Sequence, residues 1–195
     1  KRAMTCQRRL SCTRLVYSVT LRMTCAPFLS LSRVIPRNYL LNNISFQDGD
    51  KIIDCGANVG DLSLYFKTVS ASVNIIAFEP SKLECQCAEL NLINHSVYNY
   101  GLWSEDTTLT FYHSSQEADS SIFKPRKFDS FTKVQVKAGA SFSEERVKLL
   151  KLEAEGAEPE ILSGFGACLK NIEYITADLG FERGVDEEST MVPVL

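Results

Sequence analysis

One short stretch limits the folds open to this chain more than any other part of the sequence. Residues 51–60 read KIIDCGANVG, an apolar run followed by a carboxylate at Asp54 and two glycines. A continuous apolar run is typical of a strand buried within a parallel sheet. A glycine turn after such a strand brings a nucleotide-sized ligand close to the start of a helix. The stretch therefore predicts a strand, a cofactor-binding turn and a helix, in that order.

The same alternation of strand and helix continues along the chain. Strands are expected over residues 51–55, 73–78, 95–100, 147–153 and 172–178, and helices over 60–69, 80–93, 158–169 and from 187 onward. Right-handed crossovers between successive strands produce a parallel sheet. At 195 residues, the chain is long enough for one such domain with a hydrophobic core. The predicted fold class is α/β, a doubly wound, mostly parallel sheet with helices on both faces.

The middle of the chain departs from this pattern. Residues 107–113 alternate like a strand, and 133–137 form a second short strand pattern. We expect a small antiparallel insertion beside the sheet or over its C-terminal edge, where segments that shape substrate sites commonly lie. A later loop over 180–184 is expected to border the substrate pocket. Arg183 in this loop either orients an anionic substrate or pairs with Glu182.

Charge is distributed unevenly between the start of the chain and its body. The charged residues before Asp48 are all basic, whereas the whole chain has 21 Lys and Arg against 24 Asp and Glu. The body is therefore acidic, which argues against a nucleic-acid partner. We expect a poorly ordered, acid-free extension over residues 1–35, with an organelle transit peptide as the alternative, and a single domain over 36–195. No uncharged run approaches the ~20 residues of a membrane span, so no membrane partner is expected.

The cysteines carry no metal or disulfide signature. There are seven, none in a Cys-x-x-Cys pair, and only two histidines accompany them. Reduced thiols in a cytoplasmic compartment fit this usage, and neither a zinc site nor a disulfide framework is expected.

Polar residues gather where the predicted strands end. Ligands of an open α/β sheet bind beyond the carboxyl ends of the strands, where the strand order reverses. The residues expected there are Asp54, Gly56, Asn58 and Gly60 after the first strand, Glu79 after the second, Glu153 and Glu155 after the fourth, and Asp178 after the fifth. A leading carboxylate repels a pyrophosphate but suits a cationic or hydroxyl-rich ligand. S-adenosylmethionine, with its ammonium, sulfonium and ribose diol, is the best fit.

The spacing of the turn separates this ligand from a dinucleotide. The pattern is Asp-x-Gly-x-x-x-Gly instead of the Gly-x-Gly-x-x-Gly of nicotinamide folds, so a nicotinamide-dependent oxidoreductase is disfavoured. Gly56 is expected to let the backbone approach the ligand; the alternative is that Gly56 and Gly60 only permit tight packing of strand against helix. Glu79 is expected to accept both ribose hydroxyls.

Three motifs in this order resemble the FkbM-type family of S-adenosylmethionine-dependent methyltransferases. Residues 53–60 read IDCGANVG, 77–80 read AFEP and 150–158 read LKLEAEGAE. The resemblance implies a class I, Rossmann-like methyltransferase, most often one that O-methylates a sugar, polyketide or other small hydroxylated metabolite. It assigns cofactor binding to Asp54, Gly56, Asn58, Gly60 and Glu79.

The chain departs from the family pattern at two points. The family usually has Asp where this chain has Glu153, one methylene longer. Members also continue past the last helix into closing strands, whereas this chain ends at Leu195. We therefore expect a sheet truncated at its C-terminus with an exposed edge. A non-catalytic cofactor-binding module is the alternative to an active enzyme.

Methyl transfer by in-line displacement requires the protein to position the acceptor oxygen and remove its proton. The candidate bases are Glu153, Glu155 and Asp178, and crowding is expected to raise the pKa of at least one carboxylate. Glu155 and Glu158 have another interpretation, as favourable charges at the N-terminal end of the following helix. For Glu158 that interpretation is preferred. No ligand spacing calls for a metal.

Overall fold

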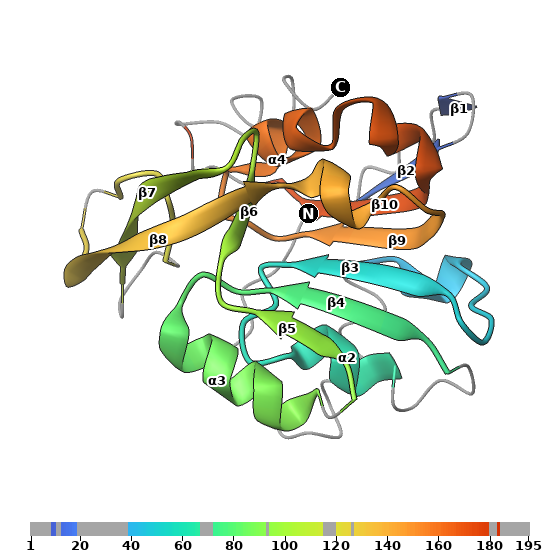
Figure 1. Ribbon diagram of the computed structural model, residues 1–195, viewed down its shortest axis with the longest axis horizontal. Helices are drawn as coiled ribbons and strands as arrows, with labels where there is room; N and C mark the ends of the chain where they lie inside the picture. Colours follow the sequence, from blue (N-terminus) through green and yellow to red (C-terminus); the bar gives the residue numbers. More distant parts are fainter. Residues whose placement is uncertain are drawn as a thin grey trace.

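The computed structural model describes residues 9–10, 13–18, 39–66, 72–92, 94–114, 120–125, 127–179 and 183. Within these ranges the chain forms a large sheet and a small one (Figure 1). The predicted loop at 180–184, apart from Arg183, and the predicted helix from residue 187 lie outside the described residues.

The large sheet has the order β1-β2-β10-β9-β3-β4-β5. Its strands are β1 (Arg9–Leu10), β2 (Thr13–Ser18), β3 (Lys51–Cys55), β4 (Asn74–Phe78), β5 (Ser96–Tyr98), β9 (Val147–Leu152) and β10 (Ile172–Asp178). All neighbouring pairs are parallel except β1 with β2. The chain builds outward from β3 through β4 to β5, and then returns to the other side of β3 with β9. The order therefore reverses between β3 and β9, which is where an open α/β sheet binds its ligand.

Helices cover both faces of the large sheet, as predicted. Figure 1 shows α2 (Asp61–Phe66) and α3 (Lys82–Asn91) on one face and α4 (Glu158–Phe165) on the other. Side chains alternate along each strand, so Ile52 packs in the core beneath α2 and α3 while Ile53 packs in the core beneath α4. Both residues are fully buried. Burial on both faces explains why these strands read as continuous apolar runs.

The predicted strand over residues 95–100 is shorter in the structure, where it is β5 (Ser96–Tyr98), and a further strand in another sheet follows it. β5 ends at Tyr98, and β6 (Gly101–Trp103) begins the small sheet. Between them the Asn99 side chain donates hydrogen bonds to the main-chain oxygens of Glu79, at 3.0 Å, and Pro80, at 3.1 Å. These bonds hold the chain at the end of β4 while it changes direction.

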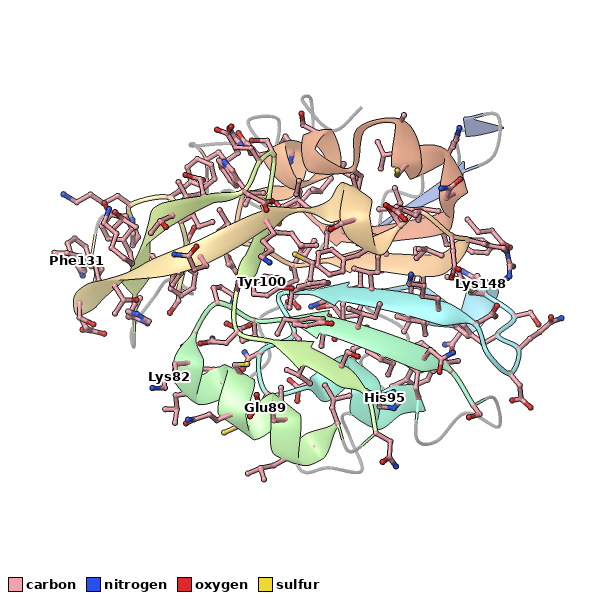
Figure 2. The ribbon with its side chains drawn as sticks, viewed as in Figure 1. Lys82, Glu89, His95, Tyr100, Phe131 and Lys148 are labelled. Atoms are coloured by element: carbon pink, nitrogen blue, oxygen red, sulfur yellow. The ribbon has the colours of Figure 1, made fainter. Side chains whose placement is uncertain are left out.

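The small sheet has the order β6-β8-β7, where β7 is Thr107–His113 and β8 is Ser130–Ala138. β7 and β8 are antiparallel, which confirms the predicted insertion, whereas β6 runs parallel to β8. β8 is longer than the predicted strand over 133–137. The sheet projects on the side to which the arrows of β3 and β4 point (Figure 1), and Phe131, 62% exposed, lies at its outer end (Figure 2).

The edge of β10 is not exposed, contrary to the expectation of a truncated sheet. β2 pairs with it in parallel from Tyr174 opposite Arg14 to Asp178 opposite Ser18. An uncovered strand edge presents unpaired N–H and C=O groups, and β2 satisfies those of β10. For residues 9–10 and 13–18 the structure thus differs from the predicted poorly ordered extension. The rest of residues 1–35 lies outside the described part.

The last crossover approaches the small sheet closely. α4 ends at Phe165 instead of 169, and the 3-10 helix η3 (Gly166–Asn171) completes the connection to β10. A Cβ added at Gly164 would lie 1.9 Å from the main-chain oxygen of Trp103. The absence of a side chain at this position therefore lets α4 pack against β6.

Gly164→Ala is expected to destabilise the fold even though alanine is the better helix former. Alanine gains about 1 kcal/mol over glycine within a helix, but the clash is with main chain and its overpacking costs about 1–3 kcal/mol. Urea unfolding followed by circular dichroism measures the change. The exposed neighbour Ser163→Ala is the matched control and should change stability little. A Gly164→Ala protein as stable as this control would contradict the packing described.

Candidate functional site

An ion pair lies at the point where the strand order reverses. β3 and β9 place Asp54 directly opposite Lys151. Asp54 is 0% exposed, Lys151 is 3% exposed, and Nζ lies 3.2 Å from Asp54 Oδ1. Lys151 lies within the third motif, residues 150–158, but no role was predicted for it. It lies near the end of β9, a strand in which every position is buried. A lysine is rarely buried without a partner, so a lysine within an apolar strand pattern is the signal that the sequence offers.

Lys151 is surrounded by oxygen atoms. Besides Asp54, Nζ lies 2.9 Å from Glu153 Oε2 and donates to the main-chain oxygens of Gly56, at 2.6 Å, and Cys55, at 3.3 Å. Burial lowers the pKa of Lys151, but the charges of Asp54 and Glu153 outweigh it and hold that pKa well above the ordinary value. The side chain is therefore an ammonium that links the glycine turn after β3 to the carboxylate after β9.

Asp54 has unused capacity to accept hydrogen bonds. Within the described part of the chain neither of its carboxylate oxygens accepts one, and the contact with Lys151 is an ion pair without hydrogen-bond geometry. Burial raises the pKa of Asp54, and Lys151 opposes the rise. A buried carboxylate of this kind is suited to a cationic or hydrogen-bond-donating ligand.

Glu153 is held through one of its two carboxylate oxygens. Oε2 accepts a short hydrogen bond from the Tyr39 hydroxyl and also contacts Lys151. Burial raises the pKa of Glu153, but the charge of Lys151 and the hydrogen bonds from Tyr39 and Lys151 outweigh burial and lower it. The pKa of this candidate base is therefore not raised; the pKa values of Asp54, Asp61 and Glu79 are raised, chiefly by burial, with neighbouring carboxylates adding to the rise.

Tyr39 enters the site from the lead-in before the first motif, a region in which no site residue was predicted. It is 7% exposed, and its main-chain oxygen accepts a hydrogen bond at 3.0 Å from Thr176 Oγ1 on β10. Burial raises the pKa of the phenol above its ordinary value. Tyr39 therefore remains a hydroxyl donor.

Glu79 and Asn58, both predicted to bind the cofactor, are joined by a hydrogen bond. Glu79 is 7% exposed; its Oε2 accepts the Asn58 main-chain N–H and its Oε1 accepts that of Ser81, both at 2.8 Å. Burial raises the pKa of Glu79 to about 7, although both hydrogen bonds lower it. Each carboxylate oxygen can accept a second hydrogen bond, so the side chain is oriented but not saturated.

The two glycines of the turn, Gly56 and Gly60, are required by the surrounding backbone in different ways. Gly56 has φ +73°, and a Cβ there would lie 1.8 Å from the main-chain oxygen of Glu153. A Cβ at Gly56 would thus collide with the main chain just after β9, which by itself requires glycine there. Gly60, at φ +87°, has only ordinary contacts around its Cβ position, so its backbone conformation is what requires glycine. The close contact at Gly56 is with the segment after β9 and not with a helix, and an approach of Gly56 to a ligand stays a prediction.

The remaining candidate carboxylates surround the same edge. Asp178 ends β10, and its charge contributes to the raised pKa of Tyr39, which places it nearby. Glu155 adopts a left-handed conformation with φ +50°, and its main-chain oxygen accepts a hydrogen bond at 2.9 Å from Ser121 Oγ. Glu158 is 0% exposed and accepts the Ala154 N–H at 2.8 Å, which matches the preferred structural interpretation.

The Arg183 side chain is held by hydrogen bonds within the protein. Its guanidinium pairs with both oxygens of Glu160 on α4 and donates to the main-chain oxygen of Gly156 at 2.9 Å. It also lies over the Phe123 ring, 4.6 Å from the centroid. Of the two predicted roles, ion pairing is therefore observed, with Glu160 as a partner; Glu182 lies outside the described residues.

The described ranges contain neither a cluster of metal-ligating side chains nor a helix that could span a membrane. No group of three or more His, Cys, Asp or Glu side chains there is arranged to hold a metal ion. No helix in that part combines the length and the hydropathy needed to cross a bilayer.

Comparison with known proteins gives a consistent result. Residues 54–185, more than half of the chain, match the family model described as the methyltransferase FkbM domain. "Methyltransferase 1" from Beauveria bassiana (strain ARSEF 2860) is 30% identical over 148 residues, which cover 61% of this chain and 59% of that protein. The match thus spans little more than half the length of this curated relative.

A solved structure shares the fold. The crystal structure of methyltransferase FkbM from Methylobacillus flagellatus KT superposes with a TM-score of 0.56 at 13% identity. The match covers 86% of this chain and 50% of that one. At this level of identity the likeness concerns the fold alone, and it confirms the Rossmann-like α/β architecture.

Lys151→Met is expected to cost about 3–5 kcal/mol of folding stability, because it leaves Asp54 buried without a counter-charge. Adding Asp54→Asn removes that charge, so the double variant should recover a large part of the loss. Urea unfolding of the two single variants, the double variant and the unmodified protein completes the cycle.

Lys148→Met is the matched control on the same strand. Lys148 is 7% exposed, lies near the start of β9 (Figure 2), and pairs with Glu173, whose side chain is 31% exposed and can be solvated. Its loss should therefore cost clearly less than that of Lys151. A double variant no more stable than Lys151→Met alone would argue against the central ion pair.

Proposed function

This chain belongs to the FkbM methyltransferase family, and on that basis we propose that it binds S-adenosylmethionine and methylates a hydroxyl group of a small metabolite or sugar. The observation that carries the proposal is Glu79. Its buried carboxylate accepts hydrogen bonds from two main-chain N–H groups at the C-terminal edge of the sheet, and each oxygen retains one acceptor position. Two acceptors side by side suit a vicinal diol such as that of ribose.

The donor set supports this cofactor. Asp54 offers a buried carboxylate without hydrogen bonds in the described part of the chain, which suits an ammonium or another donor. Gly56 and Asn58 belong to the turn after β3, which follows Asp54 in the chain. The main-chain N–H of Asn58 donates a hydrogen bond to Glu79. Asp54, Gly56, Asn58, Gly60 and Glu79 would together hold the methyl donor.

When bound, S-adenosylmethionine supplies a methyl group on a sulfonium: the acceptor oxygen forms the new C–O bond as the C–S bond breaks, and the electron pair stays on sulfur. The protein must then take the acceptor proton. Glu153 is the best placed candidate, since its main-chain N–H is bonded to Cys55 at the end of β3 and its side chain is 34% exposed. Glu155 and Asp178 lie at the same edge and remain the other candidates.

Isothermal titration calorimetry with S-adenosylmethionine and S-adenosylhomocysteine tests the cofactor. Both ligands are expected to bind, and Glu79→Ala should weaken both by about tenfold or more, because a hydrogen bond to a charged group contributes about 1.5–3 kcal/mol. Glu89→Ala, on the exposed side of α3 (Figure 2), is the matched control and should leave both affinities unchanged. Absence of binding, or equal binding in Glu79→Ala, would reject the proposed cofactor.

Binding is also expected to depend on pH through Glu79. Its pKa of about 7 means that the carboxylate loses its charge, and one acceptor position, as the pH falls from 8 to 6. The affinity for S-adenosylhomocysteine should therefore fall about tenfold over this range, in proportion to the ionised fraction. Glu79→Gln should bind more weakly but with little dependence on pH, and an equally flat profile for the unmodified protein would contradict the assignment.

The same ionisation acts on stability with the opposite sign. The folded pKa lies above the ordinary value of 4.5, so between pH 4.5 and about 7 the folded state binds more protons than the unfolded state. Glu79 therefore lowers the free energy of unfolding as the pH rises through this window, by at most about 1.4 kcal/mol per pH unit. The pH that favours cofactor binding is thus the one at which this carboxylate costs stability.

A further inference from the structure

We propose that Tyr39 and Lys151 are positioning residues that hold Oε2 of Glu153, so that its other oxygen, Oε1, is presented to the acceptor hydroxyl as the base. This inference rests on the proposed methyl transfer and assigns the proton-accepting atom within it. The acceptor O–H proton passes to Oε1 as the acceptor oxygen takes the methyl group.

The two oxygens of Glu153 have different surroundings. The Tyr39 hydroxyl and the Lys151 ammonium both contact Oε2. Among the described residues, Oε1 takes part in no hydrogen bond or ion pair, and the side chain is 34% exposed. One oxygen is therefore held from two directions, while the other has no protein partner among the described residues.

Lys151, which holds Oε2 of Glu153, is itself held by main-chain atoms. Lys151 Nζ donates to the Gly56 and Cys55 main-chain oxygens, so its position is fixed by the turn after β3. The Glu153 main-chain N–H donates to Cys55 O at 3.1 Å, and its carbonyl packs where a Gly56 Cβ would otherwise lie. Main chain and side chain of Glu153 are thus both tied to the turn that is proposed to bind the methyl donor. This arrangement sets the direction of Oε1 relative to that turn.

Tyr39 lies before residue 54, where the match to the family model begins. Its buried ring lies 5.6 Å from Lys151 Nζ, and its main-chain oxygen is bonded to Thr176 on β10. The lead-in segment therefore completes a site whose other members come from the matched domain. The Glu153 side chain is long enough for Oε2 to accept the hydrogen bond of the phenol.

Charges from several elements act on Glu153. Lys151 on β9 and the Tyr39 hydroxyl favour its ionised form, whereas Asp54 on β3 and Asp61 at the start of α2 are like charges that couple to it. Asp178 on β10 and Glu79 after β4 couple to Tyr39 and Lys151, respectively. Removing the Tyr39 donor should therefore make Glu153 easier to protonate.

Carbon-13 NMR of protein labelled at the glutamate carboxyl carbon measures this directly, with Glu153→Gln used to assign the resonance. Tyr39→Phe deletes one oxygen and keeps the ring, and it should raise the titration midpoint of Glu153 by about one pH unit, since a hydrogen bond to a charged group contributes about 1.5–3 kcal/mol. Tyr174→Phe, a half-buried tyrosine near the start of β10, is the control and should leave the midpoint unchanged. An unchanged midpoint in Tyr39→Phe would overturn the positioning role.

A second titration tests whether Oε1 faces the reacting methyl group. Bound S-adenosylmethionine carries a sulfonium charge that bound S-adenosylhomocysteine lacks. The former should therefore lower the titration midpoint of Glu153 further than the latter does. From the Coulomb energy of two charges near a protein surface, the difference should be at least about half a pH unit. Equal midpoints with both ligands bound would overturn the assignment of Oε1 while leaving cofactor binding intact. Failure of both ligands to bind would instead reject the proposed function, and the role of Oε1 with it.

Discussion

The ion pair between Asp54 and Lys151 is the interaction on which the other features of the site depend. Two charges buried in the middle of a sheet are tolerated only when each compensates the other and their remaining contacts are polar. Lys151 meets this condition through the Gly56 and Cys55 carbonyls and through Glu153. The turn after β3, the loop after β9 and the lead-in that carries Tyr39 are therefore arranged around one ammonium.

Much of the fold could be predicted from periodicity, because a strand buried on both faces has to be apolar. β10 was predicted at its observed limits for this reason, and β3 likewise. The early end of β5 at Tyr98 and the start of β6 in another sheet at Gly101 could not be read from the same signal. Both depend on hydrogen bonds from Asn99 to the end of β4, an interaction between segments about 20 residues apart, which no local pattern encodes.

The candidate site was predicted in outline for a similar reason. Glycines and carboxylates at strand ends are recognisable in sequence, and the structure brings Asp54, Asn58, Glu79 and Glu153 to one edge. Tyr39 was missed because its role is set by a partner 114 positions away. The direction of the pKa of Glu153 was beyond prediction for the same reason, since Tyr39 and Lys151 reverse what burial alone would do.

The small sheet has a core of its own, built from Phe111, Val134 and Val136. Trp103 is shared with the main core, and a hydrogen bond from Ser121 to the Glu155 carbonyl is a further link to the loop after β9. Few side chains therefore couple the insertion to the cofactor turn. The hairpin of β7 and β8 can accordingly change its length and surface as a module, without rebuilding the turn after β3 that is proposed to hold the methyl donor.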